Sequence, residues 1–408
     1  MSAAADRLTR DDVLPTGGST ILVVDDNEMN RDLLSRRLRR DGHTVAVAEH
    51  GREALAKIAA TPFDLVMLDI MMPEMNGYEV LEHLKADPAL RHIPVIMITA
   101  VGDAESVVRC IGLGAEDHLP KPFDAALLRA RVGASLAKKR LRDREQLYAR
   151  SLERELEIGR EIQAGFLPGA LPDAPGWEIA ARFAPARQVA GDFYDAFALG
   201  DGLVGLVVAD VCGKGVGAAL FMALFRTLIR AVAEQRFGAG ATAAEGLGGT
   251  LAATNDYIAR THDSANMFAT VLFAALDLRS GALDYVNAGH EAAVVVGGRL
   301  PRDGVTVRLQ PTGPAVGLMP GMSFGAARAL LEPGDALVAF TDGVVDARGA
   351  GGASFGEARL LELLAPPAAS PAAMLDSVMA ALAAHAGGAE PFDDVTMLAA
   401  RRAEAPPR

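Results

Sequence analysis

The chain has 408 residues, of which 50% are apolar and 23% charged, and its formal charge at neutral pH is −12. This length favours two domains joined by a connector, and this composition excludes disorder throughout the chain. The negative charge argues against a nucleic-acid partner, because a protein that binds nucleic acid needs a basic surface to displace phosphate counterions.

The cysteines and the N-terminal segment bear on the cellular location of the protein. Cys110 and Cys212 lie far apart and outside any CxxC pattern, so we expect neither a disulfide nor a zinc site. Residues 1–19 are polar and contain no apolar stretch long enough for a signal peptide, and no later segment approaches eighteen uninterrupted apolar residues. We therefore predict a flexible leader over 1–19, no membrane partner and a cytoplasmic location.

Residues 20–135 alternate between two kinds of segment. Short β-branched runs at 21–24, 64–69 and 94–100 are separated by amphipathic stretches at 29–40, 51–60, 77–86 and 103–113. Such alternation is typical of βαβ units around a buried parallel sheet. We predict an α/β domain over 20–135, with a doubly wound five-stranded parallel sheet.

Acidic residues follow two of these strands. Asp25 and Asp26 end the first run and Asp69 ends another, so a parallel sheet brings the three carboxylates to one edge. Carboxylates this close repel one another unless a hard cation joins them, and Mg²⁺ prefers oxygen ligands. Thr99 ends a later strand, and Lys121 could bind an incoming phosphoryl group.

These elements together resemble a CheY-type receiver domain. The resemblance rests on DD at 25–26, D at 69 followed by MMPEMNG, T at 99 and KP at 121–122. It implies phosphorylation of Asp69 by a cognate histidine kinase and a cis peptide before Pro122. It implies Mg²⁺ bound by the carboxylates with the Met71 carbonyl, and phosphoryl oxygens bound by Thr99 and Lys121. One departure is His118, at a switch position that is usually aromatic.

A long helix is predicted over 124–166. The segment has no internal proline, and apolar residues recur between charged runs such as KKRLRDRE, without a strict heptad spacing. A solvated rod and a partly coiled-coil homodimer both fit this pattern; we predict the homodimer because it would bury the apolar stripe. We assign 136–168 to a helical linker, which Pro168 ends.

Residues 169–403 contain many short strands and fewer helices, followed by a tail at 404–408. We predict strands near 177–183, 203–209, 267–277, 282–287, 291–296 and 335–340, and helices near 213–235, 243–260, 356–364 and 371–386. Strands with helices grouped between them are typical of an α+β sandwich.

A second set of carboxylates belongs to this region. Asp192, Asp210, Asp342 and the pair Asp393 and Asp394 each close or follow a β-rich run. Carboxylates that converge from distant strand ends suggest two divalent ions with a water activated for attack on a phosphoester. Cys212 lacks a phosphate loop, so a cysteinyl-phosphate mechanism is disfavoured.

This region resembles the PPM, or type 2C, phosphatases, in their RsbU and SpoIIE-like branch. The resemblance rests on EIGREIQAGFLP, FAPARQVAGDFYD and NAGH at 287–290. It implies two Mn²⁺ or Mg²⁺ ions, bridged by Asp210 with the Val211 carbonyl and completed by Asp192, Asp342 and Asp393. Asp394 is the alternative to Asp393 as the direct ligand. The implied substrate is a phosphorylated anti-anti-sigma protein of the STAS type.

Two positions depart from the phosphatase pattern. Ala190 replaces the first glycine of the usual GGD, which the backbone tolerates only if its φ is negative. Arg187 is a weak candidate for a phosphate-binding arginine. His290 could act as an acid, although a histidine in such a turn is more often structural.

Taken together, these residues predict a response regulator with a metal-dependent serine/threonine phosphatase output controlled by Asp69. The alternative is a catalytically silent phosphatase-like module that sequesters a signalling partner, and four intact aspartates argue against it. A transcription factor lacks support, because no basic helix-turn-helix follows residue 135. Phosphorylation of the receiver could activate or inhibit the output.

Overall fold

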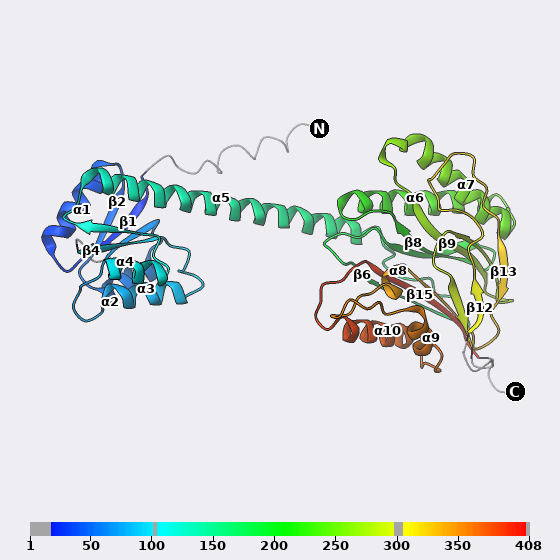
Figure 1. Cartoon of the computed structure of the whole chain (residues 1–408). Helices are drawn as coiled ribbons and strands as arrows, with labels where there is room; N and C mark the ends of the chain where they lie inside the picture. The colour runs from blue at the N-terminus through cyan, green and yellow to red at the C-terminus, as the bar shows by residue number, and fades with distance from the viewer. Residues whose placement is uncertain (1–17, 101–103, 298–304, 405–408) are drawn as a thin grey trace. The chain divides into compact units, whose positions relative to one another are not determined.

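A computed structural model describes residues 18–100, 104–297 and 305–404 (Figure 1). The chain divides into two compact units, Met1–Leu152 and Glu153–Arg408, and the division falls inside one long helix. Most of the predicted leader and residues 405–408 of the predicted tail lie outside the described residues.

The first unit contains a parallel five-stranded sheet in the order β2-β1-β3-β4-β5, as predicted. Its strands are β1 (Thr20–Val24), β2 (Thr44–Ala48), β3 (Leu65–Asp69), β4 (Val95–Ala100) and β5 (Asp117–Lys121). Its helices are α1 (Glu28–Arg40), α2 (Gly51–Ala60), α3 (Gly77–Ala86), α4 (Ala104–Gly112) and the start of α5 (Ala125–Ala164).

Both faces of this sheet are covered. One apolar cluster includes Leu22 and Leu68, and a second, on the opposite face, includes Val23 and Met67. Successive side chains of a strand point to opposite faces, so a strand buried on both sides is apolar throughout. This explains why β1, β3 and β4 were recognisable in the sequence. The strands β2 and β5 were missed, because β2 is only partly buried and β5, DHLPK, has one fully buried residue.

The apolar residues of α5 are buried near its start and exposed farther along the helix. Leu128, Val132 and Leu136 are buried in the core of the first unit, whereas Leu141 and Tyr148 are 58% and 69% exposed. The predicted helix is therefore confirmed over nearly its whole expected length. Its exposed apolar residues are compatible with a dimer, which stays a prediction.

The second unit is a sandwich of two antiparallel five-stranded sheets, as predicted. The first sheet has the order β13 (Ala327–Leu330), β10 (Ala282–Ala288), β9 (Ala269–Asp277), β8 (Leu203–Val211) and β7 (Phe193–Gly200). The second has the order β12 (Val305–Leu309), β11 (Ala293–Val296), β14 (Ala336–Phe340), β15 (Val395–Arg402) and β6 (Trp177–Ala184). The helices are α6 (Val216–Gly238), α7 (Ala243–Thr261), α8 (Asp342–Val345), α9 (Glu357–Leu364) and α10 (Pro371–Ala386), with a 3-10 turn at Asp263–Ala265.

Helices cover both outer faces of the sandwich (Figure 1). The helices α6 and α7 pack on the first sheet, and α9 and α10 pack on the second. In β8, Leu206 and Val208 point between the sheets, whereas Val207 points toward α6 and α7. Four layers thus bury three apolar interfaces, and the central strands are apolar on both faces.

The strand β7 was not predicted, because a charged residue interrupts its apolar pattern. Asp195 is 1% exposed and forms ion pairs with Arg226 at 3.0 Å and Arg230 at 3.3 Å. A buried charge is tolerated when it is paired in this way. The pairing ties β7 to α6.

Among the described residues, α6 is the one helix long and apolar enough to cross a membrane by length and composition. This is weak evidence for a membrane span, because core helices of soluble proteins satisfy the same criterion. Met222, Phe225 and Ile229 of α6 belong to the core beneath the first sheet.

Candidate functional site

Three carboxylates meet at the carboxyl edge of the parallel sheet. The neighbouring strands β1 and β3 run in parallel, and Asp25 and Asp26 follow the first while Asp69 ends the second. Their ligand oxygens lie within 4.8 Å of one another, and no other group of three such residues this close occurs among the described residues. Asp25 and Asp69 are 0% and 4% exposed. Asp26 is exposed, and an all-oxygen group of this kind fits a hard divalent cation.

Lys121 lies against this group. Its Nζ atom is 3.0 Å from a carboxylate oxygen of Asp25 and 3.0 Å from one of Asp69. The Lys121–Pro122 peptide is cis, as the receiver resemblance implied. Thr99 is buried near the end of β4, the strand that pairs with β5 and so with Lys121. The structure therefore brings Lys121 together with the three carboxylates, and Thr99 lies on the strand that pairs with the one carrying Lys121.

Burial raises the pKa of Asp69 to about 6; the charges of Asp25 and Asp26 act in the same direction, and Lys121 opposes them. Burial alone would lower the pKa of Lys121, but its bonds to Asp25 and Asp69 raise it overall. Additional positive charge at this site would therefore favour the ionised form of Asp69.

Two asparagines that sequence reasoning missed orient Asp25. The Asn30 side chain donates to both Asp25 carboxylate oxygens at 3.1 Å, and the Asn27 backbone N–H donates to one of them at 2.9 Å. Asn27 also caps α1. An asparagine directly after an acidic pair and just before a helical pattern is a typical N-cap, and this was the signal available in the sequence. These bonds fix the carboxylate that faces Lys121.

In the second unit, four carboxylates converge from four places in the chain. Asp192 precedes β7, Asp210 lies near the end of β8, Asp342 begins α8 and Asp393 precedes β15. Burial raises the pKa of Asp210 to about 6, with further contributions from the charges of Asp342 and Asp393. Burial and then the charge of Asp210 raise the pKa of Asp192 well above its usual range. The charges of Asp342 and Asp393 thus act on Asp210, and the charge of Asp210 acts on Asp192, and such a set fits divalent cations.

Close backbone approaches bring these segments together. A Cβ atom at Gly191 would lie 2.8 Å from the Val211 carbonyl oxygen, and one at Gly343 would collide with the Asp394 carbonyl. Glycine is therefore required at both positions, because any side chain would push the acidic segments apart. The Thr341 hydroxyl donates to Asp192 at 2.7 Å and holds that buried carboxylate in place.

The two carboxylates just before β15, Asp393 and Asp394, have different partners. Both carboxylate oxygens of Asp394 accept backbone N–H bonds, from Ala186 at 2.7 Å and Gly191 at 2.8 Å. Asp393 instead meets the Lys214 ammonium at 2.7 Å. This arrangement favours Asp393 over Asp394 as the carboxylate available to a metal ion.

Two sequence families match the chain. The response regulator receiver domain family matches residues 21–133, and the family described as Stage II sporulation protein E (SpoIIE) matches residues 200–403, half of the chain. The chain belongs to the SpoIIE family. It combines a receiver domain with a SpoIIE-type domain of the PPM phosphatase class.

Relatives resemble the chain in parts. Protein IcfG of Synechocystis sp. is 42% identical over 61% of this chain, which spans 41% of that protein's length. Response regulator PleD of Caulobacter vibrioides is 45% identical over 28% of this chain and 25% of its own length. The SiaA-PP2C domain of Pseudomonas aeruginosa is 24% identical, with a TM-score of 0.50 over 62% of this chain and 98% of that domain, and shares the fold of the SpoIIE domain.

The departures noted in the sequence have structural explanations in the SpoIIE domain. Ala190 is fully buried and is not among the described non-glycine residues with positive φ, so its methyl group causes no backbone strain. Arg187 is exposed, as a solvated charge would be.

His290 serves the fold of the SpoIIE domain. Its backbone N–H donates to Asn287, its ring bonds the Thr270 hydroxyl at 2.8 Å, and burial lowers its pKa to about 4. Asn287 in turn donates to the Glu291 and Leu309 carbonyls. These bonds favour the structural interpretation of the NAGH turn over an acid catalyst.

Two further predicted residues of the receiver lie near its acidic edge. Met71, whose carbonyl was expected to assist the metal, follows β3 and has an exposed side chain. His118 lies on β5 with a side chain that is 27% exposed and 3.7 Å from Asp117. Its ring thus lies beside a carboxylate, and its role as a switch residue stays a prediction.

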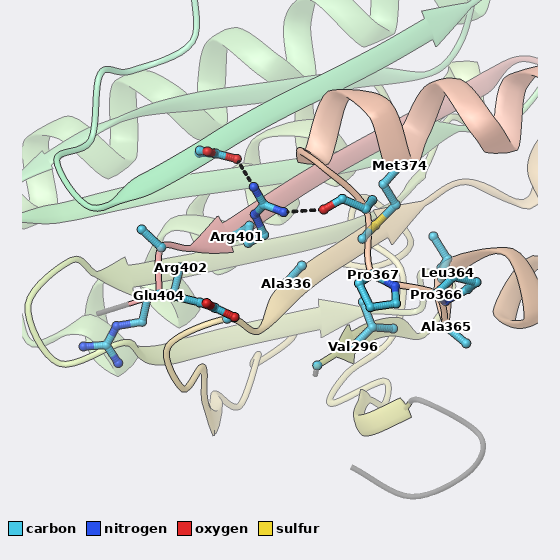
Figure 2. A pocket seen from close by; sticks show the side chains of 15 residues that line it. Val296, Ala336, Leu364, Ala365, Pro366, Pro367, Met374, Arg401, Arg402 and Glu404 are labelled. Carbon is cyan, nitrogen blue, oxygen red and sulfur yellow. Dashed lines mark hydrogen bonds and ion pairs between the residues drawn. The ribbon is translucent and has the colours of Figure 1, made fainter. Parts of the chain in front are cut away.

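A hollow of about 540 Å³ in the SpoIIE domain is separate from the acidic site (Figure 2). None of the predicted site carboxylates lines it. Its arginines already have partners: Arg401 bonds Glu178 and the Ala368 carbonyl, and Arg402 bonds backbone carbonyls. The hollow therefore offers no group suited to phosphoester chemistry.

Proposed function

We propose that the chain is a response regulator whose SpoIIE domain hydrolyses phosphoserine or phosphothreonine on a partner protein. The convergence of Asp192, Asp210, Asp342 and Asp393 in one site carries this proposal. A sequestering module with no turnover would not need four mutually repelling carboxylates, because their assembly is unfavourable without a cation.

We also propose a set of metal ligands for this domain. Asp210 with the Val211 carbonyl, together with Asp192, Asp342 and Asp393, would hold two Mn²⁺ or Mg²⁺ ions. Bound there, the ions supply an activated water and offset the charge of the phosphoester. Asp394 fastens the loop that carries Asp192, through its bonds to Ala186 and Gly191.

Lys214 is the group that we assign to the substrate phosphoryl oxygens. It lies in the GKG turn between β8 and α6, 2.7 Å from Asp393, and is 38% exposed. Gly213 and Gly215 on either side of it have the positive φ of a tight turn. A cation beside an acidic metal site is suited to hold a phosphoryl group between itself and the metals.

Replacement Lys214→Ala is expected to lower kcat/KM for a phosphoserine protein about tenfold or more, because a charge-assisted hydrogen bond contributes roughly 1.5–3 kcal/mol. The effect should lie mainly in KM, and Lys214→Arg should restore part of it. Steady-state phosphate release measures kcat and KM for each variant. Arg260→Ala, which removes an exposed cation on α7, is the control. Equal kcat/KM values for Lys214→Ala and the control would contradict the assignment.

In the receiver, we assign Asp69 as the phosphoacceptor for a histidine kinase. Asp25, Asp26 and Asp69, with the Met71 carbonyl, would hold Mg²⁺, which supplies charge compensation when bound. Lys121 and Thr99 would bind the phosphoryl oxygens. The two 3.0 Å contacts of Lys121 support this assignment.

Phosphorylation of Asp69 is expected to depend on pH. The attacking form is the carboxylate, and because burial raises the pKa of Asp69 to about 6, the reactive fraction falls as the pH drops through that value. Mg²⁺ favours the ionised form, so raising its concentration should move the midpoint to lower pH. Initial rates with acetyl phosphate between about pH 5 and 8 provide the measurement. A midpoint that does not respond to Mg²⁺ would count against metal binding at this edge.

Coupling between the two domains is assigned to α5, which begins at Ala125 in the first unit and ends at Ala164 in the second. We propose a homodimer through its exposed apolar residues, a cytoplasmic location and a phosphorylated STAS-type protein as substrate. The receiver and SpoIIE assignments support these proposals.

The proposed activity is tested with purified full-length chain, Mn²⁺ and a phosphoserine protein of the STAS type. Metal-dependent phosphate release is expected, and chelation should abolish it. A chain with Asp210→Asn should retain bound substrate without turnover, and so serves as a trap for identifying the natural partner. Binding without any turnover by the wild type would favour the sequestering module.

A further inference from the structure

The side chain of Gln163 is buried in the last turn of α5. It is 7% exposed, although Glu161 and Ile162 beside it are exposed. Its amide nitrogen donates to the Ala190 carbonyl at 2.7 Å, and its amide oxygen accepts from the Ala190 backbone N–H at 2.9 Å. One side chain thus satisfies both backbone polar groups of a fully buried residue.

Ala190 belongs to the loop that delivers Asp192. On the opposite side of this loop, Asp394 accepts from the Gly191 backbone N–H at 2.8 Å. Asp192 itself accepts from the Thr341 hydroxyl at 2.7 Å. The loop is therefore held by the end of α5 at Ala190 and by the acidic site at the next two residues.

The helix also approaches this loop closely at a second point. A Cβ atom at Gly159, one turn before Gln163, would lie 3.7 Å from the Val189 side chain. Val189 is 5% exposed and directly precedes Ala190. The last two turns of α5 consequently lie on the loop, and the amide bonds fix their register against it.

We propose that Gln163 is a positioning residue that holds the loop 189–192 in the arrangement in which Asp192 can bind metal. Glutamine suits this task because its amide presents a donor and an acceptor together, whereas an ionised glutamate offers only acceptors. The inference rests on the proposed metal-dependent function, and it identifies the contact through which a shift of α5 would change metal affinity.

The test measures Mn²⁺ binding as well as activity. Full-length chains carry Asp26→Ala, so that the receiver does not contribute a second Mn²⁺ site, and Mn²⁺ affinity is measured by titration calorimetry. Gln163→Ala removes both bonds, Gln163→Met keeps the side-chain length without them, and Glu161→Ala is the control on the same turn. Thermal melts establish that each variant is folded.

Both Gln163 variants are expected to bind Mn²⁺ roughly 10- to 100-fold more weakly than the control, because loss of a group that orients a ligand has this effect. At saturating Mn²⁺ their kcat should approach that of the control. General destabilisation would not weaken Mn²⁺ affinity while leaving kcat intact. A folded Gln163→Met chain with unchanged Mn²⁺ affinity would overturn the inference. If the control itself neither binds Mn²⁺ nor hydrolyses substrate, the proposed function fails as well, so the two failures are distinguishable.

Discussion

Replacement Asp210→Asn is expected to reduce hydrolysis of a phosphoserine protein by at least about a thousandfold, equivalent to roughly 4 kcal/mol of transition-state stabilisation. The charges of Asp342 and Asp393 act on Asp210. The amide removes an anion that would hold the metal ions, so the Mn²⁺ dependence should disappear together with the rate. Phosphate release under saturating substrate is the measurement.

The matched control is Asp201→Asn in the turn between β7 and β8. Asp201 is exposed and has a φ of 50°, a conformation that asparagine also tolerates. The same chemical change at that position should leave the rate within about twofold. Comparable rates for Asp210→Asn and Asp201→Asn would eliminate the proposed metal centre.

The second large effect concerns the receiver. Asp69→Asn is expected to abolish stable phosphoryl incorporation from acetyl phosphate or a histidine kinase, because an amide cannot form the acyl phosphate. Lys121→Ala should leave Asp69 in place but slow incorporation strongly, since Lys121 lies 3.0 Å from that carboxylate. Intact-mass measurement detects the added phosphoryl group.

An aspartate in a surface ion pair provides the comparison for the receiver. Asp32→Asn on α1 affects only an exposed contact with Arg36 and should leave incorporation unchanged. Incorporation into Asp69→Asn at the wild-type level would place the phosphoacceptor elsewhere.

The sequence was sufficient for predicting the fold and the main carboxylates, because both depend on local patterns. Strands such as β1 and β3 are apolar on both faces, and parallel pairing then places Asp25 and Asp69 at the same edge. Glycines at close approaches, such as Gly191, lie directly beside the acids that they bring together. For Ala190 the sequence left open whether the methyl group strains the backbone, and the structure answers this, because Ala190 is not among the described residues with positive φ.

What the sequence did not reveal are contacts between residues far apart in the chain. Thr341 lies 149 residues from the carboxylate it holds, and Gln163 lies 27 residues from Ala190. Neither residue stands out in its local pattern, since Gln163 sits in a charged helix and Thr341 at a strand end. Lys214 likewise has no local signal of a role at the site, because its ion pair with Asp393 forms only when β8 and β15 are folded into opposite sheets.

The central claim, that the receiver controls a phosphatase, is tested most directly by one comparison. Phosphate release from a phosphoserine protein is measured with full-length chain and Mn²⁺, with and without beryllofluoride, which mimics the phosphoryl group on Asp69. We predict that beryllofluoride changes the rate of the wild type in one direction and leaves Asp69→Asn unaffected. Hydrolysis by the wild type at the same rate with and without beryllofluoride bound would contradict the account.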